Sequence, residues 1–267
     1  MPHWMHEFAH SNTAAALFAV LSWWFGTGAI LWLVRRPRHT LRLRMLAMTA
    51  LLIAGLIGAW YSMQAQGSLQ AYLGFASVIA MWGWHELAFL SGWLIGPRRE
   101  PLSPGLGTYS RFVQSLQAIL HHELGLLLNF GLLIWLQVGH PNHVAVCTFA
   151  LLWVMRLSAK LNLFIGVPQL GEQYLPVHLQ YLGSYFQRGQ VGWFYWVCIA
   201  LATSAWLGLV LQAVVGAVEL STGWILLATL LALAIIEHLL MMFPLQLQQL
   251  WGWALRPTRG QQAGARP

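Results

Sequence analysis

The sequence predicts an all-α integral membrane protein, a polytopic helical bundle with seven transmembrane helices. The chain has 267 residues, of which 58% are hydrophobic and only 8% are charged, whereas soluble domains carry about 25% charged residues. The hydrophobic residues form seven continuous runs of about 20 residues, the length that an α-helix needs to cross a bilayer. Most of the charged residues lie between these runs. These observations exclude a disordered chain and an ordinary soluble enzyme.

The seven spans follow one another along the chain with short connections. They are Ala14–Val34, Met45–Gln64, Ala71–Ile95, Phe112–Val138, His143–Ile165, Val191–Ala217 and Thr222–Phe243. Continuous apolar runs favour helices over the strands of a membrane barrel, which alternate in segments of about ten residues. Prolines lie just beyond five of the spans, where they disturb a helix least. We expect residues 1–245 to form the transmembrane domain and residues 246–267 a basic cytoplasmic tail.

The basic residues predict the orientation of the bundle. All 14 lie in or near alternate connections, so they fall on one side of the predicted membrane. They are Arg35, Arg36, Arg38, Arg42, Arg44, Arg98, Arg99, Arg111, Arg156, Lys160, Arg188, Arg256, Arg259 and Arg266. Because cytoplasmic loops are enriched in Lys and Arg, the N-terminus should lie outside and the C-terminus inside. The net charge of +7 is then explained by the basic loops on the cytoplasmic side and by their attraction to anionic membrane lipid. We expect no binding to nucleic acid.

The longest predicted inner loop carries a short amphipathic pattern near residues 174–187. Leu175, Leu179 and Leu182 are apolar at helical spacing, with tyrosines between them. Pro176 suits the first turn of a helix. We expect a short helix at the inner membrane surface, which could cover the bundle, dock a partner or act as a plain interfacial anchor.

Three glutamates lie within predicted spans, and each is next to a histidine. An ionisable side chain at this depth is costly unless it is paired, and it marks a functional site by default. At 1.5 Å per residue, the three clusters share one layer in the inner half of the bilayer. Imidazoles and carboxylates are ligands of transition metals such as iron, and imidazoles also bind haem and chlorins. The candidate metal ligands are Glu86, Glu123, Glu237, His85, His122 and His238, and the candidate cofactor ligands are His85, His121, His122 and His238.

Arg156 and Lys160 support a structural interpretation of the same layer. Both project from the fifth span at similar depth and could form ion pairs with two of the glutamates, while the histidines form hydrogen bonds between helices. Glu123 points nearly opposite to the face that carries His121, so the fourth span must be buried on two sides or Glu123 belongs to a separate contact. No HExxH motif is present, and catalytic residues stay unassigned.

Five segments of the sequence resemble one family of membrane proteins. They are WWFGTGAI (Trp23–Ile30), WGWHELAFLSGWLIGPRR (Trp82–Arg99), QAILHHELGLLLN (Gln117–Asn129), LWVMRLSAKLNLFIGVP (Leu152–Pro168) and LPVHLQYLGSYF (Leu175–Phe186). Their order and spacing are similar to those of the PuhE-type photosynthetic-complex assembly proteins of purple phototrophic bacteria. The resemblance implies a multi-pass protein of the bacterial inner membrane, cytoplasmic or intracytoplasmic, encoded among genes for reaction-centre assembly and bacteriochlorophyll metabolism. It transfers no catalytic residue.

Two functional hypotheses follow. The first is an assembly factor for the photosynthetic reaction centre or light-harvesting complex that handles bacteriochlorophyll through the His/Glu layer. Its partners, implied by the resemblance, are reaction-centre or light-harvesting polypeptides or pigment-synthesis enzymes. The alternative is a membrane oxidoreductase that uses iron or haem and acts on a lipophilic tetrapyrrole, carotenoid or quinone. Whether the protein is an enzyme depends on what the polar layer holds.

Overall fold

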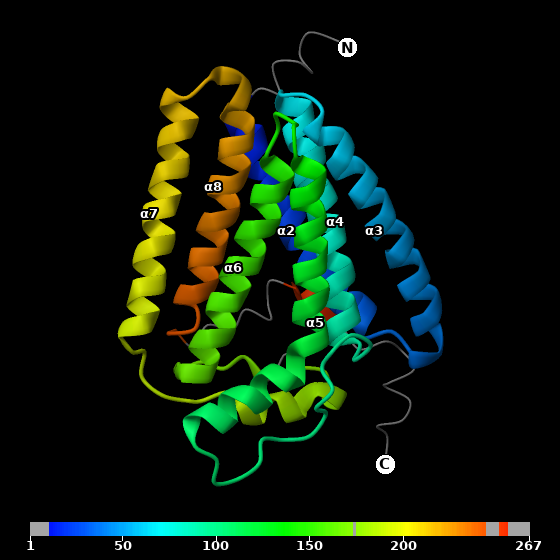
Figure 1. Cartoon of the computed structure of the whole chain (residues 1–267), viewed down its shortest axis with the longest axis vertical. Coiled ribbons are helices and arrows are strands. Elements are labelled where there is room, and N and C mark those ends of the chain that lie inside the picture. The colour runs from blue at the N-terminus through cyan, green and yellow to red at the C-terminus, as the bar shows by residue number, and fades with distance from the viewer. Residues whose placement is uncertain (1–10, 173–174, 244–250, 256–267) are drawn as a thin grey trace.

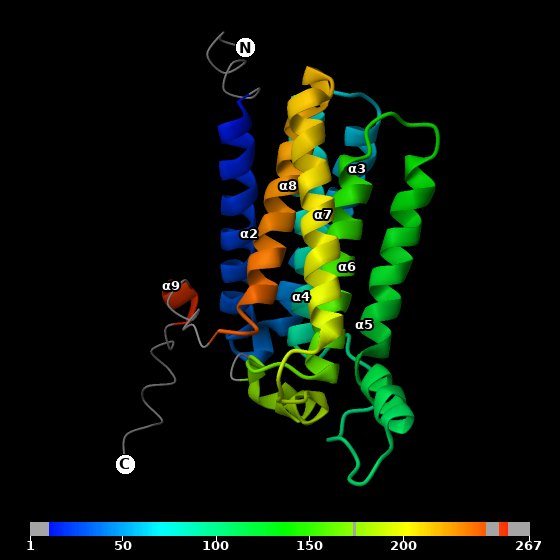
Figure 2. The ribbon, with the colours of Figure 1, turned by 90° about the vertical axis from the view of Figure 1, so that its left-hand side faces the viewer.

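Seven long helices run side by side along a common axis (Figures 1 and 2). The computed structural model describes residues 11–172, 175–243 and 251–255, and these contain no β-strand. Each of the seven helices is long and apolar enough to cross a membrane. They are α2 (Asn12–Val34), α3 (Leu41–Met63), α4 (Ser68–Leu90), α5 (Thr108–Gln137), α6 (Val144–Ile165), α7 (Trp193–Val215) and α8 (Val218–Leu239). The prediction of an all-α protein with seven spans is confirmed.

Most helix boundaries lie close to the predicted ones, but the end of α4 does not. The predicted span ran to Ile95, whereas the helix ends at Leu90. Gly92 follows in a left-handed conformation with φ of 79°. The N–H groups of Trp93 and Leu94 both donate hydrogen bonds to the carbonyl of Ala88. This is a glycine-based helix stop. It places His85 closer to the helix end than the sequence predicted.

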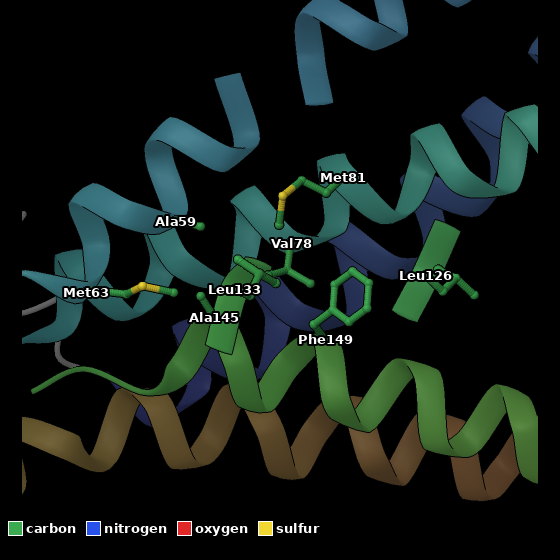
Figure 3. Close-up of a cluster of buried hydrophobic side chains, with 8 residues drawn as sticks. All are labelled: Ala59, Met63, Val78, Met81, Leu126, Leu133, Ala145 and Phe149. Carbon is green, nitrogen blue, oxygen red and sulfur yellow. The ribbon is translucent and has the colours of Figure 1, made fainter. Parts of the chain in front are cut away.

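Helix α4 lies at the centre of the bundle and is buried along much of its length. It packs most closely on α3, because glycines face small residues there: a Cβ at Gly55 would lie 2.8 Å from the carbonyl oxygen of Ser77. Figure 3 shows the hydrophobic core that α4 shares with α3, α5 and α6. It consists of Ala59, Met63, Val78, Met81, Leu126, Leu133, Ala145 and Phe149.

One end of the bundle, formed by the connections 35–40, 91–107 and 166–192, carries arginines and is called the basic end below. A 3-10 helix, η3 (Val177–Tyr185), packs there. The sequence predicted a short amphipathic helix in this place. Leu179, Leu182 and Tyr185 are its buried residues, and their spacing of three matches the 3.0 residues per turn of a 3-10 helix. They pack on Ile95 and Ala118.

Most of the predicted C-terminal tail lies outside the described residues, but Trp251 and the short helix α9 (Gly252–Leu255) are described. Trp251 Nε1 donates a hydrogen bond of 3.0 Å to the carbonyl of Trp24 on α2. A Cβ at Gly28 would lie 2.1 Å from Trp253, so this glycine makes room for the indole. Nothing in the sequence pattern predicts this contact with the first span.

Candidate functional site

Two cations on α6 hold two different neighbouring helices. Arg156 Nη2 donates to Glu86 Oε2 on α4 at 2.9 Å. Lys160, one helical turn further along, pairs with Glu123 Oε1 on α5. The side chains of Glu86 and Glu123 are only 11% and 12% exposed. Because each carboxylate lies inside the bundle beside a cation, the pairs offset part of the cost of burying charge.

Helix α5 is buried on two sides, as the rotation of 100° per residue requires. Glu123 faces α6, where its second oxygen accepts a hydrogen bond of 3.2 Å from Trp153 Nε1. His122 faces α4 and packs against Phe89, with 4.6 Å between ring centroids. His121 is exposed and takes no part in either contact.

The third cluster, on α8, is engaged in hydrogen bonds of its own. Glu237 accepts a bond of 2.8 Å from Trp23 Nε1 on α2. His238 Nδ1 lies 2.9 Å from the carbonyl of Ala234, so this nitrogen donates, and Nε2 accepts from the Ser158 hydroxyl at 3.0 Å. Both ring nitrogens of His238 are therefore used.

His85 and His122, called the histidine pair below, are only 3% and 1% exposed. Their ring centroids lie 6.4 Å apart. His85 Nε2 contacts Asn129 Nδ2 at 2.9 Å, but Nδ1 of both histidines has no hydrogen-bond partner among the described residues. Glu86 Oε1 and Asn129 Oδ1 are also buried without a partner there. Buried polar atoms are nearly always satisfied, so these four unsatisfied atoms require an explanation.

The surroundings of the histidine pair are largely aromatic. Trp84 and Phe149 approach the His85 ring edge-on, with centroids 5.0 and 6.4 Å away. Gly125 on α5 lies opposite, and a Cβ there would be 3.7 Å from His85 Nδ1. Leu94 Cδ2 lies 3.1 Å from the same Cβ position, so the Leu94 side chain packs into the space that Gly125 leaves beside the imidazole.

The turn after α4 positions the backbone of His122. The N–H of His122 donates to the carbonyl of Ile95 at 3.1 Å. A Cβ at Gly96 would lie 1.8 Å from the carbonyl oxygen of Gln117. The segment 95–98 therefore lies directly on the α5 backbone, and the first part of α5 runs at an angle to the rest (Figure 2). Sequence reasoning missed this contact, for which the glycine before Pro97 was the only signal.

The candidate ligands do not form one cluster. Within the described part of the chain, no three His, Cys, Asp or Glu side chains gather in a way that could hold a metal ion. Glu86 and Glu123 pair with cations, Glu237 bonds to Trp23, and the carboxylates thus point to three different partners. What the structure brings together is the histidine pair.

A family model described as "Protein of unknown function (DUF3623)" matches residues 9–262. The chain belongs to the DUF3623 family. The match includes all seven helices and therefore the histidine pair. A relative from Rhodobacter capsulatus, named "Uncharacterized 30.4 kDa protein in puhA 5'region", is 38% identical over 250 residues, which cover 90% of this chain and 89% of the relative. No solved structure matches this DUF3623 member.

Proposed function

We propose that this protein is an assembly factor for the bacterial photosynthetic reaction centre or light-harvesting complex, and that it handles bacteriochlorophyll at the histidine pair. The Rhodobacter capsulatus relative is named for its position in the 5′ region of puhA, which agrees with the resemblance to photosynthetic-complex assembly proteins. Its high coverage of both chains supports a common role in the photosynthetic apparatus. The seven spans suit a factor that meets membrane-embedded pigments and polypeptides.

The observation that carries the pigment proposal is the pair of buried imidazoles with unsatisfied Nδ1 atoms. A bare metal ion takes most of its ligands from side chains, usually four or more, and the described residues do not gather even three. A metal held in a tetrapyrrole receives four nitrogens from the macrocycle, so one histidine suffices as the axial ligand. The histidine pair is therefore suited to bind the metal of a tetrapyrrole and not a bare metal ion.

The aromatic side chains around the pair fit the same class of ligand. Phe89, Trp84 and Phe149 present ring faces and edges beside the imidazoles. Flat conjugated rings pack well on such surfaces. The haem oxidoreductase is a second candidate because haem would use the same axial ligand, and its absorption spectrum separates it from the chlorin.

The charge distribution supports an orientation for this chain in the bacterial inner membrane. Arginines occupy the connections 35–40, 91–107 and 166–192, whereas the opposite connections 64–67, 138–143 and 216–217 have no Lys or Arg. By the positive-inside rule, the basic end faces the cytoplasm and α2 begins on the outer side. Reporter fusions at residues 66 and 104 test this, because an alkaline phosphatase fusion should be active only at residue 66.

Purification from cells that make bacteriochlorophyll tests the proposed function. We expect far-red chlorin absorption to accompany the wild-type protein in mild detergent. His85→Leu or His122→Leu, whichever removes the axial ligand, should lose it, whereas His121→Leu, a change of the exposed neighbour of His122, should keep it. A Soret band without far-red absorption would favour the haem oxidoreductase. Colourless wild-type protein, together with normal reaction-centre levels in a deletion strain, would overturn the proposal.

A further inference from the structure

A cavity of about 320 Å³ opens at the basic end, outside the histidine pair. It lies between the beginning of the second span, the turn after α4 and η3. Polar and apolar groups share its lining: Arg38, Ser91, Arg99, His178 and Tyr181 beside Leu41, Ile95 and Leu179. Its volume falls at the lower end of the range of about 300–1,000 Å³ that is common for small-molecule sites.

Two polar atoms in the cavity wall lack a partner. His178 Nε2 and Tyr181 Oη are buried and make no hydrogen bond to any described residue. Gly92, in its left-handed conformation, lies against this imidazole, and a Cβ there would be 3.2 Å from Nε2. A hydroxyl group and an imidazole N–H are donors. The Tyr181 hydroxyl can therefore donate to an oxygen-rich ligand in the cavity, and His178 Nε2 donates only in the tautomer that carries the proton on this nitrogen.

The charges around the cavity have one sign. Arg38 and Arg99 line it, and the three ion pairs found among the described residues involve other cations. Burial and the nearby Arg38 guanidinium lower the pKa of His178 from its ordinary value. Burial raises the pKa of the Tyr181 hydroxyl, which therefore keeps its proton. A bound anion would compensate the two arginines, neither of which forms an ion pair with a carboxylate among the described residues.

We propose that this cavity binds the phosphate group of an anionic phospholipid headgroup. Arginine recognises phosphate oxygens through its planar set of donors, and basic pockets beside transmembrane helices bind anionic headgroups. The apolar part of the lining, Leu41, Ile95 and Leu179, suits the glycerol and upper acyl portion of a lipid. Free inorganic phosphate has no apolar portion that could contact these three side chains.

The site has a direct connection to the histidine pair. Ile95 contributes to the cavity, and its carbonyl accepts the hydrogen bond from the backbone N–H of His122. A headgroup that bridges η3 and the turn after α4 would hold Ile95 in place. The proposal stands without a pigment, because it depends only on the residues of the basic end.

Native mass spectrometry of the purified full chain, titrated with phosphatidylglycerol or phosphatidylcholine, tests the proposal. We expect a saturable preference for phosphatidylglycerol. Arg38→Gln and Arg99→Gln should each weaken it about tenfold, because each removes a charge-assisted contact to phosphate. Arg42→Gln is the control, since Arg42 is exposed at the same end and does not line the cavity.

Tyr181→Phe removes one hydroxyl with little change of shape and should weaken phosphatidylglycerol binding severalfold in a protein that still runs as wild type in size-exclusion chromatography. Equal losses in Arg42→Gln and in the two cavity variants would show general surface attraction and overturn the proposal. Inorganic phosphate that binds the lipid-free protein saturably, and displaces phosphatidylglycerol at equal concentration, would overturn the assignment to a lipid.

Discussion

The imidazole of His85 on α4 and that of His122 on α5 lie 6.4 Å apart between ring centroids, both inside the bundle. Different groups position them: Asn129 contacts His85, and the carbonyl of Ile95 holds the backbone of His122. The nearby carboxylates Glu86 and Glu123 are held by α6. The intramembrane layer thus divides into ion pairs that join helices and two imidazoles with unsatisfied Nδ1 atoms.

The pair of Lys160 and Glu123 should contribute to stability mainly because neither charge can be left alone inside the bundle. Lys160→Met or Glu123→Gln alone should lower the free energy of unfolding by about 3 kcal/mol, and the double variant should recover part of this loss. The surface pair of Arg188 and Glu172 is the control and should give less than about 1 kcal/mol in the same double-mutant cycle. Chemical denaturation in detergent measures both, and equal coupling energies would contradict the account.

Gly96→Ala should destabilise the protein strongly. The added methyl group would lie 1.8 Å from the carbonyl oxygen of Gln117, so the segment 95–98 would have to leave α5. We expect a loss of about 3 kcal/mol, the upper part of the usual range for overpacking. Gly131→Ala, on α5 itself, meets no atom within 4 Å, and alanine favours a helix by up to about 1 kcal/mol over glycine. A Gly96→Ala protein as stable as Gly131→Ala would rule out this packing.

Gly28→Ala should release the C-terminal segment from α2. Its Cβ would lie 2.1 Å from Trp253, whereas a Cβ at Gly26 would make an ordinary contact of 3.5 Å with Ile79. We expect chymotrypsin to cleave after Trp253 about tenfold faster in Gly28→Ala, because the enzyme must bind an indole that a displaced segment exposes more often. Gly26→Ala should be cleaved at the wild-type rate. Equal rates in the two variants would show that Trp253 does not depend on Gly28.

Acidification should destabilise the basic end through His178. Burial and the nearby Arg38 hold the pKa of His178 below its ordinary value in the folded protein. In the unfolded chain, the imidazole binds a proton as the pH falls to about 6.5 and below, whereas in the folded protein it binds the proton only at lower pH. This contribution to stability is complete above about pH 6.5 and declines as the pH falls through that value. His178→Gln should therefore show a smaller decrease in apparent Tm than wild type between about pH 7.5 and 5.5. The same decrease in both proteins would contradict it.

The seven spans could be predicted from the sequence, because a long continuous apolar run is a strong signal. Each transmembrane helix also satisfies its backbone hydrogen bonds internally and needs no partner for this. The sequence left two alternatives for the fourth span, burial on two sides or a separate contact for Glu123, and the structure shows that His122 faces α4 while Glu123 faces α6. The end of α4 was predicted five residues too late, because Trp93, Leu94 and Ile95 are apolar and hide the turn at Gly92.

The site itself was harder to predict. The sequence placed three His/Glu clusters at one depth, but the partner of each side chain depends on the rotation and tilt of the helices. Lys160 and Arg156 therefore could not be assigned to particular glutamates. The packing of Trp251 and Trp253 on α2 and of Gly96 on α5 joins segments far apart in the chain. Periodicity within a single helix carries no information on such contacts.

The measurement that tests the central claim most directly compares a magnesium-containing bacteriochlorophyll with its metal-free form. If the histidine pair supplies an axial ligand, the purified protein should bind the magnesium form at least about tenfold more tightly, since only that form gains a metal–nitrogen bond. His85→Leu or His122→Leu should abolish the difference, and His121→Leu should preserve it. Equal binding of the two forms by wild-type protein, or a preference that survives in both His85→Leu and His122→Leu, would contradict the account.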